Sequence, residues 1–144
     1  MKILFLCTGN SCRSQMAEGW TRALKGDSIQ VWSAGIEKHG LDPLAVQVMA
    51  EAGVDIAQQR SKLLEELDES DFDFVVTVCD NARESCPLFP GHAKIVHRSF
   101  PDPPTLVRNT VDEEEKLARY REVRDQIRSF VEALPDVLYD ADNG

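Results

Sequence analysis

The segment Phe74 to Val78 is apolar except for one threonine and reads Phe-Val-Val-Thr-Val. A strand with one face in water would alternate polar and apolar residues, so this run predicts a strand that is buried on both faces. Strands of that kind belong to parallel sheets with helices packed on them. The run therefore restricts the chain to α/β architectures.

Further strands and helices are expected along the rest of the chain from apolar periodicity, capping residues and proline or glycine stops. The other predicted strands cover residues 3–6, 29–33 and 94–98. The predicted helices lie between Ser11 and Gly26, from Asp42-Pro43 to Gly53, over 62–67, and from a capping box at Thr110 to Pro135. Residues 100–104 contain three prolines and are predicted to be a loop.

Strands separated by helices of ordinary length form right-handed crossover units, so the fold class is predicted to be α/β with a four-stranded parallel sheet flanked by helices in three layers. A chain of 144 residues is long enough for one such domain. We assign residues 1–135 to this domain, and we expect the acidic tail, residues 136–144, to be frayed. In these sheets the ligand crevice lies beyond the carboxyl ends of the strands.

The charge balance argues against polyanionic partners. Lysine and arginine total 16 against 25 acidic residues, which leaves a formal charge of −9 and predicts that the chain binds neither nucleic acid nor an anionic membrane. No stretch approaches the ~20 apolar residues of a membrane span, and the first residues do not resemble a signal peptide. We expect a cytoplasmic monomer whose four cysteines remain reduced.

The loop between the first strand and the first helix carries the strongest chemical signal. Cys7 ends the strand and Arg13 begins the helix, so backbone N–H groups and the positive end of the helix dipole converge on a nest for a tetrahedral oxyanion. The Arg13 guanidinium adds a two-pronged clamp. The same field is expected to lower the pKa of Cys7 and to supply a nucleophilic thiolate. The predicted oxyanion-binding residues are Thr8, Gly9, Asn10, Ser11, Cys12, Arg13 and Ser14.

Other polar residues receive more limited roles. Asp102, held between two prolines, is the candidate general acid, although a loop aspartate used only for its turn propensity is an equal alternative. Cys12 is expected to be a buried packing thiol. No metal site is predicted, because the cysteine pairs lack the short spacing of zinc motifs. The three histidines are expected to be structural or solvated; they are His39, His92 and His97.

The second pair of cysteines distinguishes reduction from hydrolysis. A phosphatase needs one cysteine and an acid, which leaves Cys79 and Cys86 unexplained. In a two-electron reduction, Cys79 can attack the Cys7 sulfur, expel the reduced product and leave a disulfide. Cys86, in a polar loop, can then attack at Cys79 and present the Cys79–Cys86 disulfide to an external dithiol. Two unrelated loop cysteines remain the alternative.

Residues 6–20, which read Leu-Cys-Thr-Gly-Asn-Ser-Cys-Arg-Ser-Gln-Met-Ala-Glu-Gly-Trp, closely resemble the opening of the thioredoxin-coupled arsenate reductases. That family shares the fold of the low-molecular-weight protein tyrosine phosphatases. The likeness extends to about residue 131 through segments 33–37, 39–41 and 76–79, through Cys86-Pro87, and through Phe100 with Asp102-Pro103.

The resemblance implies a role for each candidate residue. Cys7 would attack arsenate, Arg13 and the loop amides would bind it, and Asp102 would assist the loss of water. Cys79 would then release arsenite, and Cys86 would carry the disulfide outward to thioredoxin.

Two departures from the family pattern bear on ligands. Some members bind potassium near the loop through residues matching Asn10, Glu18 and Ser33 together with a threonine and an aspartate, where this chain has Arg60 and Lys62. Two cations argue against bound potassium, so we predict no cofactor and expect Lys62 to substitute for the ion's charge beside Glu18.

The second departure lies after Asp102-Pro103, where tyrosine phosphatases carry aromatic residues and this chain has Pro104-Thr105. The difference weakens, without removing, the alternative of a low-molecular-weight tyrosine phosphatase that uses Cys7, Arg13 and Asp102. A thiol-based sensor or arsenite-binding module is a further alternative. The sequence also leaves open whether thioredoxin, glutaredoxin or another thiol is the electron donor.

Overall fold

The computed structural model describes residues 1–79 and 93–142, and its centre is a four-stranded sheet in the order β2-β1-β3-β4. All three neighbouring pairs are parallel. The strands are β1 (Lys2–Cys7), β2 (Gln30–Gly35), β3 (Phe74–Thr77) and β4 (Lys94–His97). The predicted α/β class with a four-stranded parallel sheet is confirmed.

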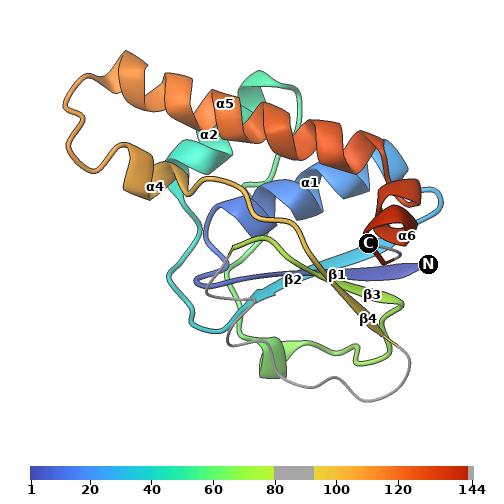
Figure 1. Cartoon of the computed structure of the whole chain (residues 1–144). Helices are drawn as coiled ribbons and strands as arrows, with labels where there is room; N and C mark the ends of the chain where they lie inside the picture. Colours follow the sequence, from blue (N-terminus) through green and yellow to red (C-terminus); the bar gives the residue numbers. More distant parts are fainter. Residues whose placement is uncertain (80–92, 143–144) are drawn as a thin grey trace.

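Three longer helices, α1, α2 and α5, gather on one side of the sheet, and the short helix η1 lies on the other side (Figure 1). The helices are α1 (Arg13–Lys25), α2 (Pro43–Glu51), η1 (Leu64–Glu66), α4 (Pro103–Leu106), α5 (Glu113–Glu132) and α6 (Asp136–Asp142). The helix expected over 62–67 is thus a single 3₁₀ turn. No helix in the described part of the chain has the length and apolarity needed to cross a membrane.

The hydrophobic core lies between the sheet and the helix pair α1 and α5. All four residues of β3 are buried, as the apolar run predicts. Met16 and Trp20 of α1 are buried against the sheet and α5, and the Trp20 indole donates to the carbonyl of Arg124 in α5 at 3.2 Å. Full burial of one large apolar side chain contributes ~1.5–3 kcal/mol, so this helix pair anchors the residues that follow β1.

The strand order places the end of β1 at the centre of one sheet edge. From β1 the chain passes to β2 on one side and later to β3 on the other, so the order reverses at β1. In open parallel sheets this reversal opens the crevice that receives ligands. Cys7 ends β1, and Cys79 lies two residues beyond the end of β3.

Two predictions about the second half of the chain are wrong in detail. A short helix begins at Pro103 within the segment predicted to be a loop, because proline fits the first helical turn, where its missing N–H has no partner. Helix α5 begins at Glu113 with Asp112 as its N-cap, so the capping box expected at Thr110 does not form.

The acidic end is not frayed over residues 136–142, which form α6. Leu138 is fully buried, and the ring of Tyr139 meets that of Phe74 edge-on with centroids 5.4 Å apart. The apolar residues among the aspartates therefore fasten the helix to the sheet, an effect that the acidic composition hides.

Candidate active site

The loop that follows β1 turns its carbonyl groups outward. Each carbonyl oxygen from Cys7 to Cys12 accepts a hydrogen bond from a group flanking the loop. The donors, in order, are the amides of Ile36, Glu37 and His39, the side chain of Gln15, and the amides of Asp42 and Met16, at 2.8–3.2 Å. Among the described residues, no protein group accepts a hydrogen bond from the backbone amides of Gly9 to Arg13. The loop therefore leaves these amides available as donors, which is the arrangement that the predicted oxyanion nest requires.

Asn10 holds the shape of the loop from below. It has a φ of 49°, a left-handed conformation that asparagine tolerates better than most residues. Its fully buried side chain donates to the hydroxyls of Ser14 at 2.8 Å and Ser33 at 3.0 Å. Its Oδ1 accepts from the amide of Lys62 at 2.9 Å. A buried network with satisfied members fixes one loop conformation. Asn10 and Ser14 do not line the cavity that Cys7 borders, and they thus shape the loop from below.

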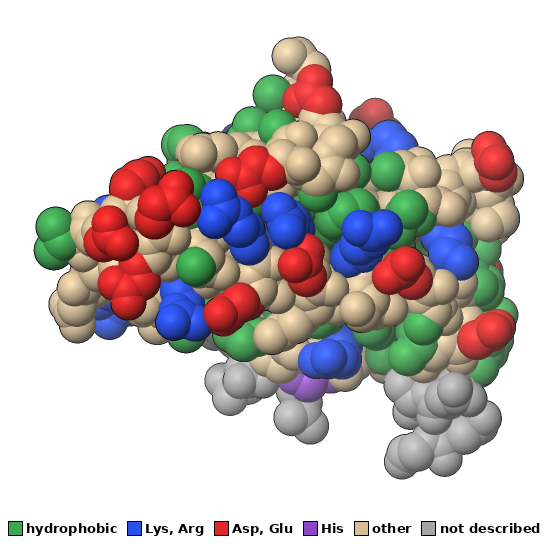
Figure 2. All heavy atoms as spheres, turned by 90° about the horizontal axis from the view of Figure 1, so that it is seen from above, with side chains coloured by type: hydrophobic (Ala, Val, Ile, Leu, Met, Phe, Trp, Pro, Cys, Tyr) green, Lys and Arg blue, Asp and Glu red, His purple; other side chains and the backbone are tan. Residues whose placement is uncertain are grey.

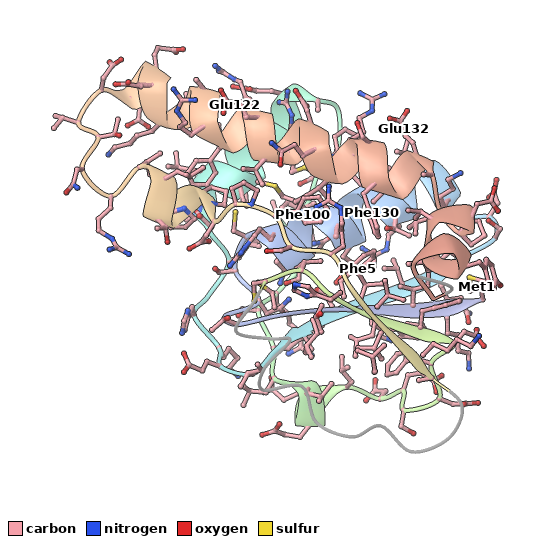
Figure 3. The ribbon with its side chains drawn as sticks, viewed as in Figure 1. Met1, Phe5, Phe100, Glu122, Phe130 and Glu132 are labelled. Carbon is pink, nitrogen blue, oxygen red and sulfur yellow. The ribbon has the colours of Figure 1, made fainter. Side chains whose placement is uncertain are left out.

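Arg13 brings the proline-rich segment to the same site. One terminal nitrogen donates to the carbonyl of Phe100 at 2.9 Å, and the other lies 3.4 Å from Oδ1 of Asp102. The ring of Phe100 meets Phe130 of α5 edge-on between that helix and the sheet, which fixes the position of the carbonyl (Figure 3). The Arg13 Nε is buried and has no partner among the described residues. An unpaired buried donor costs about 1–3 kcal/mol, and a bound oxyanion would relieve that cost.

Asp102 stands at the mouth of the site. Its Oδ2 accepts a hydrogen bond from the Thr105 hydroxyl at 2.6 Å, while Oδ1 faces Arg13. Together with Pro104 it lines a cavity of about 330 Å³ whose floor is the loop that carries Cys7. The structure thus brings the candidate acid to the candidate nucleophile, and turn propensity alone does not account for its position.

Cys7 and Cys79 form one hydrogen-bonded thiol pair in the crevice. Neither forms a disulfide, and both are almost fully buried. The hydrogen bond with Cys79 and then burial raise the pKa of Cys7 well above its usual value, while Arg13 and the Thr8 amide act in the opposite direction. The hydroxyl of Thr8 also lies 3.1 Å from the Cys79 sulfur. The lowered pKa that the sequence predicts for Cys7 is therefore wrong here, because the neighbouring thiol and the loss of solvent outweigh the cation.

Cys12 is buried, as expected, at the end of the loop next to α1, and it borders the same cavity as Cys7. Burial, followed by the carboxylates of Asp42 and Asp102, raises its pKa well above the usual value. Two other residues named from the sequence, Cys86 and His92, lie outside the described residues.

The potassium-related residues come together beneath the loop. The Ser33 hydroxyl donates to Glu18 at 2.6 Å, and the Lys62 ammonium lies 3.6 Å from Glu18 and 3.5 Å from Ser33. Burial lowers the pKa of Lys62, whereas Glu18 acts in the opposite direction. The Lys62 ammonium lies among the oxygens that would bind potassium, so these residues do not fit an added potassium ion. That the protein binds no potassium stays a prediction. A larger hollow of about 490 Å³ borders Lys62, but no cysteine lines it among the described residues.

His39 is a site residue that the sequence reasoning missed. It lines the same cavity as Cys7 and Asp102. The other described histidine, His97, does not line that cavity. Its Nδ1 lies 2.8 Å from the Thr77 hydroxyl. The sequence signal that could have found His39 is its place after β2. Because β1 and β2 are parallel neighbours, their carboxyl ends lie at the same edge of the sheet, next to the loop.

Comparison with known proteins agrees with this geometry. The family model described as low molecular weight phosphotyrosine protein phosphatase matches residues 2–141. The chain belongs to that family. It is 50% identical over 125 residues to an arsenate reductase of Bacillus subtilis strain 168, covering 87% of this chain and 88% of the relative.

Solved structures of this family include both reductases and phosphatases. An arsenate reductase in its oxidized state superposes with a TM-score of 0.73 and 32% identity over 92% of this chain and 95% of the other. A low molecular weight protein tyrosine phosphatase from T. tengcongensis superposes with a TM-score of 0.73 and 28% identity, covering 94% of this chain and 98% of the other. Both chemistries therefore occur on this scaffold, and the distinction has to come from the site.

Proposed function

We propose that this protein reduces arsenate to arsenite. The observation that carries the proposal is the hydrogen bond between Cys79 and Cys7, the thiol at the floor of an oxyanion pocket. Hydrolysis of a phosphate ester has no use for the second thiol, whereas a two-electron reduction requires one. The names of the relatives, arsenate reductase among them, support the same substrate.

In the first step the substrate binds to the loop amides and to Arg13, whose Nε then gains a partner. The Cys7 sulfur bonds to arsenic as an As–O bond breaks. The thiol hydrogen and the departing hydroxyl leave together as water, and Asp102 passes the proton to the leaving oxygen. The balance is thiol plus hydrogen arsenate giving a sulfur-bound arsenate and water.

In the second step Cys79 attacks the Cys7 sulfur. The electron pair of the S–As bond passes to arsenic, which changes from As(V) to As(III), and the Cys79 proton leaves with arsenite. A Cys7–Cys79 disulfide remains. The Thr8 hydroxyl, 3.1 Å from the Cys79 sulfur, can donate to the attacking thiolate.

In the third step Cys86 attacks the disulfide at Cys79 and restores the Cys7 thiol. An external dithiol then reduces the Cys79–Cys86 disulfide, and we propose thioredoxin as that donor. We also propose that the enzyme works in the cytoplasm, as a monomer and without a metal or organic cofactor. The two electrons of each turnover then come from thioredoxin and reach arsenic through the cysteines.

The test combines the protein with arsenate, thioredoxin, thioredoxin reductase and NADPH. We expect arsenate-dependent NADPH oxidation and formation of arsenite. Cys79→Ser should abolish arsenite release, and Cys86→Ser should release about one arsenite per enzyme and then stop. Dithiothreitol in place of thioredoxin separates failure of the donor from failure of the reaction.

Aryl phosphate hydrolysis measured in the same preparation tests the phosphatase alternative. Steady hydrolysis that is indifferent to Cys79→Ser, without arsenite formation from any dithiol, would replace the reductase proposal. Tight retention of arsenite without reduction of arsenate would instead support a binding or sensor protein.

A further inference from the structure

His39 lines the oxyanion pocket and comes from a different segment of the chain than the acid. It lines the 330 Å³ cavity together with Cys7, Arg13 and Asp102. Arg13 and Asp102 belong to α1 and to the start of α4, whereas His39 comes from the segment that follows β2. The cavity therefore has polar groups on two sides, and the mechanism above uses only one of them.

The position of the His39 ring is fixed from two directions. Its backbone amide donates to the Gly9 carbonyl at 3.1 Å, and its ring lies so close to Gly9 that an added Cβ would sit 2.6 Å from Cγ. Its Nε2 lies 2.6 Å from the Glu37 carboxylate. The glycine in the loop thus gives this ring room to lie directly on the anion cradle.

The Glu37 contact determines which ring nitrogen carries hydrogen. A carboxylate can only accept, so Nε2 donates to Glu37, and Nδ1 is left available for another partner. The Gly9 contact places Nδ1 against the loop. Neutral Nδ1 accepts from a protonated substrate oxygen, and protonated Nδ1 donates to an unprotonated one. Both states complement a hydrogen arsenate or hydrogen phosphate ion.

We infer that His39, oriented by Glu37, is a further oxyanion-binding residue that contacts the outward side of the substrate. The inference rests on the proposed function for the identity of the substrate, but it applies to any tetrahedral oxyanion in this pocket. Glu37 is a positioning residue, because it reaches the anion only through the imidazole. The His39 side chain is 52% exposed, so its contribution should be smaller than that of the more buried Arg13.

Titration calorimetry of inorganic phosphate binding to the reduced full-length protein tests this inference without requiring turnover. His39→Phe keeps a flat ring on Gly9 and removes both nitrogens, and we expect the phosphate Kd to rise about tenfold. His39→Gln keeps one polar group and should give a smaller increase. Glu37→Gln leaves the imidazole but weakens its anchor, and we expect about a threefold rise.

The matched control is Glu66→Gln. Glu66 pairs with Lys38 at 2.8 Å, beside His39, yet it does not line the cavity, so its loss should leave phosphate binding unchanged. With arsenate as substrate, His39→Phe should raise KM and largely retain kcat. Loss of packing alone would not change KM without changing kcat.

Wild-type affinity in His39→Phe would overturn the inference and assign the ring a packing role only. If that variant fails to fold, the phosphate affinities of His39→Gln and Glu37→Gln decide the question, and wild-type values in both would overturn it. If the wild-type protein binds phosphate but does not reduce arsenate, the proposed function fails. The assignment of His39 would then stand or fall on phosphate binding alone.

Discussion

Cys7 lies at the front of the loop, where β1 ends, and Cys12 at its rear, where α1 begins. Both line the cavity and are almost equally buried, at 4% and 3% exposure. Their neighbours differ. Arg13 acts on both thiols, but Cys7 also meets a second thiol, whereas Cys12 is close to the carboxylates of Asp42 and Asp102. Burial alone therefore does not decide which thiol reacts. The sulfur partner distinguishes the front thiol, whereas burial and then the nearby carboxylates raise the pKa of the rear thiol.

The rear of the loop is anchored rather than reactive. The Asp42 amide donates to the Ser11 carbonyl at 2.9 Å, and its carboxylate accepts from the Leu44 amide and, at 2.7 Å, from the Tyr120 hydroxyl of α5. The outer surface of α5 has neither a reactive thiol nor a single anchor; acidic and basic side chains are interspersed along it (Figure 2). Such exposed pairs contribute little to stability. The half-buried anchor at Asp42 connects the loop to both α2 and α5.

The largest expected effect separates the two thiols by activity. Cys7→Ser should lower arsenite formation at least ~10³-fold, because a hydroxyl cannot form the S–As bond or the disulfide that follows it. Cys12→Ala should keep activity within about threefold, because Cys12 enters no bond-forming step. Arsenite is measured at saturating donor, with the far-ultraviolet spectrum as a control for folding. A Cys12→Ala variant as inactive as Cys7→Ser would abolish the distinction between front and rear.

A smaller effect is expected at Thr8. Thr8→Val removes the hydroxyl 3.1 Å from the Cys79 sulfur but keeps the side-chain shape. Loss of a hydrogen bond to a forming thiolate should slow arsenite release about tenfold and leave the phosphate Kd unchanged. Single-turnover arsenite release is the measurement.

Thr21→Val is the matched control, because its hydroxyl donates to the Ala17 carbonyl inside α1, away from the cavity. It should lower stability without changing the release rate. Equal rates in Thr8→Val and the wild type would show that the hydroxyl does not assist Cys79.

Much of the fold could be predicted from local patterns. The apolar run that contains β3 indicates a parallel sheet because polar alternation is missing, and Asp42-Pro43 marks the start of α2 with a carboxylate that does cap the Leu44 amide. Leu138 was less predictable. Its burial depends on where α5 ends against the sheet, which no local pattern encodes.

The candidate site divides in the same way. Cys7 and Arg13 are visible in the sequence because the loop lies between a strand and a helix that position it locally. The raised pKa of Cys7 was not visible, because it depends on Cys79, which is distant in sequence and reaches the site through β3. His39 was missed for a related reason, since only the pairing of β1 with β2 brings it to the loop.

The smallest expected effect concerns the rear thiol and alkaline pH. The folded pKa of Cys12 is raised above its usual 9.0, so the unfolded chain loses this proton first as the pH rises. The stabilising contribution is therefore complete below pH 9 and is lost as the pH climbs toward the folded pKa. In urea unfolding at pH 8 and pH 10, the wild type should lose about 1 kcal/mol more stability than Cys12→Ala. All other titrating groups are common to both proteins, so parallel stability profiles would mean that the Cys12 thiol ionises as readily in the fold as in the unfolded chain. Burial and the nearby carboxylates would then not protect it.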